Sequence, residues 1–290
     1  INDYKEVINI LPTIVATSFV NLERNKLIQI NLTTFIRCIN NDKHVPENEK
    51  HNILILRGGI SWFNCSAYYL KSVSSYFTEH VRVFVLEKYD PMVDMNFTDD
   101  IIDAMNYIRQ HYPGRLVVIG YSMGAVLLSA YLAKTEARDA DLFILCCNSF
   151  NIREFREVLN THSLFQWIQK KDLAVFGAKT LEELMEKQGV NIKQQEHFMD
   201  HLISNLNKTH KKWHSKTLYV ISEKDPITLN YKEAMSKFEK RPYTILCRGA
   251  WHCCSKVVAS TFELAYDFFD VSDQMGKNCR VKDFLKSNSS

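Results

Sequence analysis

The segment Leu116–Ala133, LVVIGYSMGAVLLSAYLA, constrains the fold of this chain more than any other stretch. Its start is typical of a short buried parallel strand, and the part from Val126 onward is typical of an apolar helix. Between them stands Gly-Tyr-Ser-Met-Gly, in a chain with only 9 glycines among 290 residues. A strand, a tight turn around serine and a helix form a nucleophile elbow, where close packing leaves no room for Cβ atoms two residues either side of the serine. This pattern predicts that the Ser122 hydroxyl points into a cleft with the Met123 N–H beside it; the alternative is an ordinary turn with a solvated serine.

Strand-like and helix-like segments alternate along the chain from residue 53 onward. Such alternation predicts an α/β protein with a doubly wound, mostly parallel sheet. One further helix is expected to be capped by Thr98–Asp100 and stopped by Pro113–Gly114. The expected strands are residues 52–56, 81–86, 116–119, 141–147, 217–222 and 243–247, and the other expected helices are residues 61–77, 126–133 and 256–269.

The alternation is interrupted between about Phe150 and Trp213, where the sequence has helical signals and no convincing strand. We therefore expect a helical cap insertion after the sixth strand, although a plain long crossover is the alternative. The predicted organisation is an N-terminal extension with the first strands (1–50), a core (51–149 and 214–272), a cap or lid (150–213) and a C-terminal tail (273–290).

Composition narrows the class of protein. A hydrophobic content of 46% over 290 residues supplies one large core, so one domain with an insertion is expected. The net charge of +3 is too small to indicate a nucleic-acid partner.

The apolar stretch Leu11–Val20 is too short to span a bilayer. The sequence begins at Ile1 rather than Met, so an upstream anchor or leader could have been removed.

Cysteines and glycosylation sequons give opposite indications of compartment. Of 8 cysteines, Cys146 and Cys147 are neighbours in an apolar strand, and Cys253 and Cys254 are neighbours beside a histidine. Adjacent cysteines rarely bridge each other, which predicts reduced, buried thiols and a cytoplasmic or membrane-associated protein. The secretory pathway stays open because five Asn-x-Ser/Thr sequons are present, at Asn31, Asn64, Asn96, Asn207 and Asn288.

A base and an acid that complete a serine site are expected after the last two strands. A serine hydroxyl needs a histidine to take its proton, and the histidine needs a carboxylate to fix its tautomer. His252 lies in the turn after residues 243–247, at the carboxyl edge where open α/β sheets form their sites. Asp225 follows residues 217–222 directly, with Glu223 as the rival acid.

The sequence also predicts an oxyanion hole. Besides the Met123 N–H, a second backbone donor is needed. The glycine-containing stretch Leu56–Ile60 follows the first clear strand, and we assign the donor to Ile60 with Gly59 as the alternate.

Four stretches of the chain resemble the α/β-hydrolase superfamily, more closely its YheT-like branch, which includes abhydrolase-domain monoacylglycerol lipases and esterases. The resemblance covers roughly residues 50 to 270, and it implies that Ser122 is the nucleophile, Asp225 the acid and His252 the base. The chain departs from the branch at Ala125, at Ala250–Trp251 and at Arg57–Gly58. The resemblance rests on Tyr107–Pro113, Gly120–Gly124, Ser222–Pro226 and Gly249–His252.

Other clusters in the cap region favour no special chemistry. His197 and His201, and again His210 and His214, have the spacing of zinc ligands on a helix, but Phe198 stands where a metalloprotease needs glutamate. We expect no metal and no cofactor. The basic stretch 208–213 could contact an anionic membrane surface or could simply be solvated.

The expected function is a serine hydrolase that cleaves carboxylic esters, of lipid or acylglycerol type, through an acyl-enzyme. The alternatives are a non-catalytic ligand-binding protein with the same fold and an acyltransferase with the same triad. Phe165 and Trp167 in the cap and Trp251 beside the histidine are expected to line the substrate pocket. The expected partner is a small-molecule ester or lipid, and the oligomeric state stays open.

Overall fold

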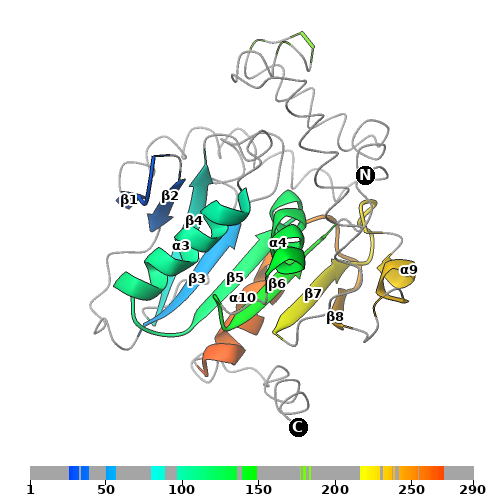
Figure 1. The fold of residues 1–290 in the computed structure, drawn as a ribbon. Coiled ribbons are helices and arrows are strands. Elements are labelled where there is room, and N and C mark those ends of the chain that lie inside the picture. Colours follow the sequence, from blue (N-terminus) through cyan, green and yellow to red (C-terminus); the bar gives the residue numbers. More distant parts are fainter. Residues whose placement is uncertain are drawn as a thin grey trace.

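A computed structural model shows an eight-stranded sheet with the strand order β1-β2-β4-β3-β5-β6-β7-β8 (Figure 1). The structure describes residues 26–32, 34–38, 50–56, 80–88, 97–135, 139–148, 177, 179–180, 183, 216–228, 231–236, 238, 242–253 and 255–270. The strands are β1 (Lys26–Gln29), β2 (Thr34–Cys38), β3 (His51–Leu56), β4 (Val81–Lys88), β5 (Leu116–Tyr121), β6 (Leu142–Cys146), β7 (Thr217–Ser222) and β8 (Tyr243–Cys247). The helices are α3 (Phe97–His111), α4 (Met123–Lys134), α9 (Tyr231–Ser236) and α10 (Ser255–Phe269).

The direction of the strands confirms the predicted mostly parallel sheet. Strands β3 to β8 pair in parallel, and β1 and β2 add an antiparallel edge beside β4. Parallel strands need crossovers, and the helices of these crossovers cover both faces of a sheet. The six strands expected from the sequence are all present, whereas the ranges of β1 and β2 were not predicted.

Both faces of the sheet are buried, which explains the continuous apolar runs of the central strands. Every residue of β5, β6 and β7 is buried. Successive side chains point to opposite faces, so Val118 packs in the core with α3 and α4 while Val117 packs in the core with α10. Figure 1 shows α3 and α4 on one face and α10 on the other.

The start of α3 differs from the expectation. The helix begins at Phe97, so Thr98 lies within the first turn and does not cap the helix from outside. The Thr34 hydroxyl of β2 donates a hydrogen bond to Asp100, and the buried Thr98 hydroxyl has no hydrogen-bond partner among the described residues. The predicted cap was wrong because the helix begins one residue before Thr98, so that Thr98, Asp99 and Asp100 all lie inside its first turn.

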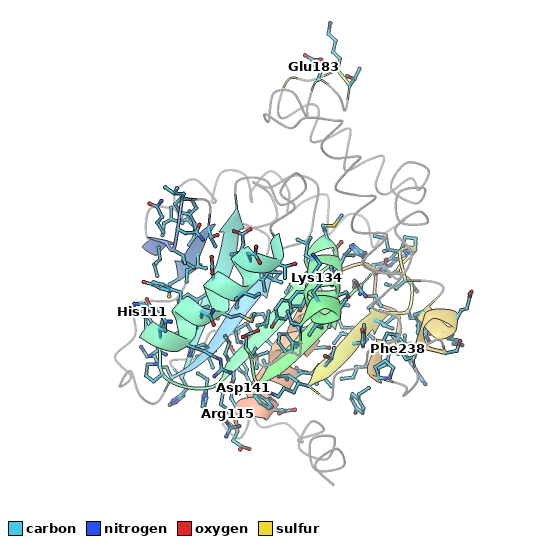
Figure 2. The ribbon with its side chains drawn as sticks, in the orientation of Figure 1. His111, Arg115, Lys134, Asp141, Glu183 and Phe238 are labelled. Atoms are coloured by element: carbon cyan, nitrogen blue, oxygen red, sulfur yellow. The ribbon has the colours of Figure 1, made fainter. Side chains whose placement is uncertain are left out.

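Polar contacts fix the amino ends of the central strands. The Asp141 carboxylate accepts a hydrogen bond from the Leu116 N–H at 2.8 Å. It also forms an ion pair with Arg109 at 3.2 Å. Arg115 donates to the Phe268 carbonyl at 2.6 Å, which ties α10 to the same edge. Figure 2 shows Arg115 and Asp141 close together at this edge. The opposite, carboxyl edge is where the turns after β5, β6, β7 and β8 meet.

Several predictions cannot be compared with the described residues. The expected helix at 61–77 lies outside them, as does nearly all of the cap at 150–213.

Within the described part of the chain, no helix combines the length and the apolar character needed to cross a membrane. The described cysteines are buried and form no disulfide: Cys38, Cys146, Cys147, Cys247 and Cys253.

Candidate active site

Ser122 occupies a strained turn between the last residue of β5 and the first residue of α4. Its backbone has φ 52° and ψ −115°, a region that side-chain-bearing residues seldom adopt. Three hydrogen bonds hold it there: Ser122 N–H donates to the Cys146 carbonyl at 2.9 Å, and the Ser122 carbonyl accepts from Ala125 at 3.0 Å and Val126 at 3.1 Å. The turn therefore has the geometry of the predicted nucleophile elbow.

Gly120 is required by close packing between β5 and α4. A Cβ atom at this position would lie 2.7 Å from the Gly124 carbonyl oxygen and 2.8 Å from the Ala125 Cα. Both neighbours are backbone atoms, which cannot move aside independently of the helix. The steric argument from the sequence is confirmed at this glycine.

Ser122, His252 and Asp225 form a continuous hydrogen-bonded chain. The distance from Ser122 Oγ to His252 Nε2 is 2.8 Å, and the distance from His252 Nδ1 to Asp225 Oδ2 is 2.7 Å. The three residues come from the turns after β5, β8 and β7, as the sequence predicted. The structure thus brings together the three side chains assigned to nucleophile, base and acid.

The Asp225 carboxylate is held by its own turn. Its Oδ1 accepts the Ile227 N–H at 2.9 Å, and its carbonyl accepts the Thr228 N–H at 3.2 Å. Asp225 is fully buried. Pro226 fits the position after Asp225 because its ring fixes φ and its backbone nitrogen carries no hydrogen that would need an acceptor. One carboxylate oxygen is thereby used to fix the turn, and the other faces His252.

Glu223, the rival acid, has a different partner. Its Oε2 accepts the Gly249 N–H at 2.7 Å, which ties the turn after β7 to the turn before His252. Gly249 has φ 68° with open space around the position of a Cβ. Glycine is favoured at this position because the backbone is left-handed.

Burial and the ion pair act in opposite directions on the two titrating groups. Burial lowers the pKa of His252, but the Asp225 carboxylate and the Cys253 sulfur together outweigh it and hold that pKa well above 6.5. Burial also raises the pKa of Asp225 above 3.8, although the attraction of His252 opposes the rise. The carboxylate therefore stabilises the imidazolium form that a histidine base must pass through.

The other predicted site residues are only partly described. The Met123 N–H lies in the first turn of α4, where backbone N–H groups have no acceptor within the helix. Trp251 precedes His252, and its ring lies 5.8 Å from Lys224 Nζ in a cation–π contact. Ile60, Gly59, Phe165 and Trp167 lie outside the described residues.

Cys147 is a neighbour of the site that sequence reasoning missed. Its sulfur lies within 4.8 Å of ligand atoms of both Asp225 and His252. No local signal in the sequence marked this position, because the expected strand 141–147 included Cys147, whereas β6 ends at Cys146. The apolar character of the preceding strand led to its interpretation as a core thiol.

The comparisons with known proteins concern the fold. A search with protein-family models gave no match, and a search of curated sequences gave none either. Among solved structures, carboxyl esterase 2 from Tuber melanosporum is similar with a TM-score of 0.55 and 16% identity, covering 85% of this chain and 87% of that one. An esterase from Pyrobaculum calidifontis gives 0.56 and 11%, covering 92% and 91%.

A third similar structure has a different activity in its name. A puromycin-hydrolyzing peptidase from Mycobacterium tuberculosis matches with a TM-score of 0.52 and 12% identity, over 85% of this chain and 39% of that one. Together with the parallel sheet, its antiparallel edge and the helices on both faces, these similarities show that the chain has the α/β-hydrolase fold.

Gly120→Ala tests the packing that supports the elbow. We expect it to lower the free energy of unfolding by about 3 kcal/mol, since the new methyl group meets backbone on two sides. Gly249→Ala is the matched control, because it meets open space and adds only the cost of a left-handed residue, about 1 kcal/mol. Urea denaturation measures both. Equal stability of Gly120→Ala and the wild type would contradict the packing argument.

Proposed function

We propose that this chain is a serine hydrolase of carboxylic esters. The observation that carries the proposal is the hydrogen-bonded chain from Asp225 through His252 to Ser122, with its two distances of 2.7 and 2.8 Å. A strained serine at a strand-to-helix turn, a histidine and a buried carboxylate are the parts that nucleophilic acyl transfer requires. The esterases with the same fold support this assignment by analogy only.

The residues divide the reaction into two steps. Ser122 Oγ attacks the ester carbonyl while His252 Nε2 takes its proton, and His252 then gives that proton to the departing alcohol. The resulting acyl-enzyme is hydrolysed when His252 activates water in the same way. Asp225 fixes the tautomer of His252 and stabilises the imidazolium during both steps.

The oxyanion is proposed to be held by backbone donors. The Met123 N–H is one candidate, since it begins α4 and adds the favourable field of a helix N-terminus. Ile60, with Gly59 as alternate, is the proposed second donor. Both assignments follow from the positions of two turns in the sequence, after the strands 52–56 and 116–119.

The proposed substrates are lipid or acylglycerol-type esters. The support is the apolar character of the cap sequence, including Phe165 and Trp167, and of Trp251 next to the base. Assignment to the YheT-like branch belongs to the same proposal and rests on the four motifs in the sequence. An acyltransferase would use the same triad, and analysis of products with and without added alcohol separates it from a hydrolase.

Ser122→Ala tests the nucleophile. We expect hydrolysis of p-nitrophenyl butyrate to fall by at least about a thousandfold, because the remaining groups cannot form an acyl-enzyme. Circular dichroism is expected to match the wild type, since the methyl group of alanine fits wherever the serine side chain did. A folded variant that keeps its turnover would rule out Ser122 as the nucleophile. A wild type without turnover that still binds an apolar ester would favour the non-catalytic alternative.

The pH dependence of kcat/KM tests the role of Asp225. His252 must be neutral to accept a proton, so the rate is expected to fall as the pH drops through the His252 pKa, with a midpoint above pH 6.5. Asp225→Asn removes the charge that raises this pKa, so the acid limb is expected to move to lower pH and the plateau to fall by about 10⁴-fold.

Glu223→Gln is the control for that profile. It keeps an acceptor for the Gly249 N–H but removes the rival carboxylate, and the acid limb is expected to stay where it is in the wild type. A shift in Glu223→Gln as large as in Asp225→Asn would mean that the two carboxylates share the role.

Phe165→Ser and Trp167→Ser test the proposed lipid pocket. We expect each to lower kcat/KM for long-chain p-nitrophenyl esters at least about tenfold more than for the acetate, because only long chains use that apolar surface. Leu32→Ser removes a leucine that is 91% exposed, so it serves as the surface control. Equal losses on both substrates would indicate a structural role for the two cap residues.

A further inference from the structure

Three cysteines gather beside the proposed base, at the carboxyl edge of the sheet. Cys146 ends β6, Cys147 follows it, and Cys253 follows His252. Their sulfur atoms all lie within 4.8 Å of one another, and those of Cys146 and Cys147 are 3.9 Å apart. Cys146 and Cys147 are fully buried, and Cys253 is 9% exposed. We refer to these three residues as the thiol cluster.

Cys147 belongs both to the thiol cluster and to the surroundings of the triad. Its sulfur accepts the Cys253 N–H at 3.4 Å and lies 3.1 Å from the Ser222 hydroxyl oxygen. The same sulfur, an Asp225 oxygen and a His252 ring nitrogen form a second set of atoms within 4.8 Å. A change at the thiol cluster is therefore transmitted directly to His252 and Asp225.

The backbone is strained at two of the three cysteines. Cys147 has φ 52° and Cys253 has φ 46°, both in the left-handed region that favours glycine. A residue with a side chain costs roughly 1–2 kcal/mol there. Such residues concentrate at functional sites, and here the sulfurs of both residues lie within 4.8 Å of each other.

The dimensions of the thiol cluster suit a thiophilic ion. Zinc–sulfur bonds of about 2.3 Å in a tetrahedral site separate the sulfurs by about 3.8 Å, close to the observed 3.9 Å. Three thiolates outweigh the charge of a divalent ion and leave the site with a net charge of −1, so the ion is not buried as an unpaired cation. Each thiol that binds the metal releases its proton to solvent.

We propose that Cys146, Cys147 and Cys253 bind one thiophilic divalent ion of the zinc class, and that the bound ion inhibits the hydrolase. The inhibitory half rests on the function proposed above. The ion draws Cys147 into its coordination shell, and the net negative charge of the site stabilises the protonated form of His252, which cannot accept the Ser122 proton. No metal was expected from the sequence, where the ligand spacings are those of the pairs His197 and His201 and His210 and His214.

Cadmium titration tests the binding half. Reduced protein, desalted under nitrogen, is titrated with Cd²⁺ while the thiolate-to-cadmium charge-transfer absorption is followed. Cys253→Ser is expected to weaken the binding at least about tenfold, and Cys146→Ala is the second variant in case the first does not fold. Cys247→Ser is the matched control, because Cys247 is also buried but contacts Ser260 at 3.8 Å, outside the thiol cluster. We expect it to bind Cd²⁺ like the wild type.

Two results would overturn the proposal. The metal site is wrong if no charge-transfer band forms, or if the cluster variants bind Cd²⁺ as tightly as Cys247→Ser does. The inhibitory role is wrong if an equivalent of Cd²⁺ binds and leaves ester turnover unchanged. Ser122→Ala separates this inference from the proposed function, since it is expected to bind Cd²⁺ normally although it lacks activity.

Discussion

The contact between β5 and α4 at Gly120 is the constraint on which the site depends. Because no side chain separates strand from helix there, the chain can reverse at Ser122 with a left-handed backbone and still continue into α4. The strain is held by hydrogen bonds to β6 and to the first turn of the helix. Ser122 is thereby fixed at the edge of the sheet, which would avoid an ordering cost in the reaction that we propose.

The parallel sheet does the remaining positioning. Ser122 and His252 are 130 residues apart in the sequence, yet their side chains are hydrogen-bonded because β5 and β8 end at the same edge. The turns after β7 and β8 are also joined to each other, through Glu223 to the Gly249 N–H and through Lys224 N–H to the Ala250 carbonyl at 2.9 Å. These bonds join the turns that carry Asp225 and His252.

The sequence predicted the parts that depend on local pattern. Apolar runs predicted the six parallel strands. The glycines around Ser122 and the turns that follow the last two strands predicted Ser122, Asp225 and His252, which the structure brings together. Features that depend on a distant partner were missed. The hydrogen bond between Thr34 and Asp100 joins two residues that are 66 positions apart in the sequence. Cys147 acquires its surroundings from turns that follow two other strands, which no local pattern reveals.

The identity of the nucleophile is the central claim, and chemical labelling tests it most directly. Folded protein is treated with a fluorophosphonate, digested, and mapped by mass spectrometry for the phosphonylated residue. We predict one adduct per chain, on the peptide that contains Ser122, and a slower reaction when His252 is replaced by alanine. A folded wild-type chain that stays unmodified, or an adduct on a different serine, would contradict the assignment.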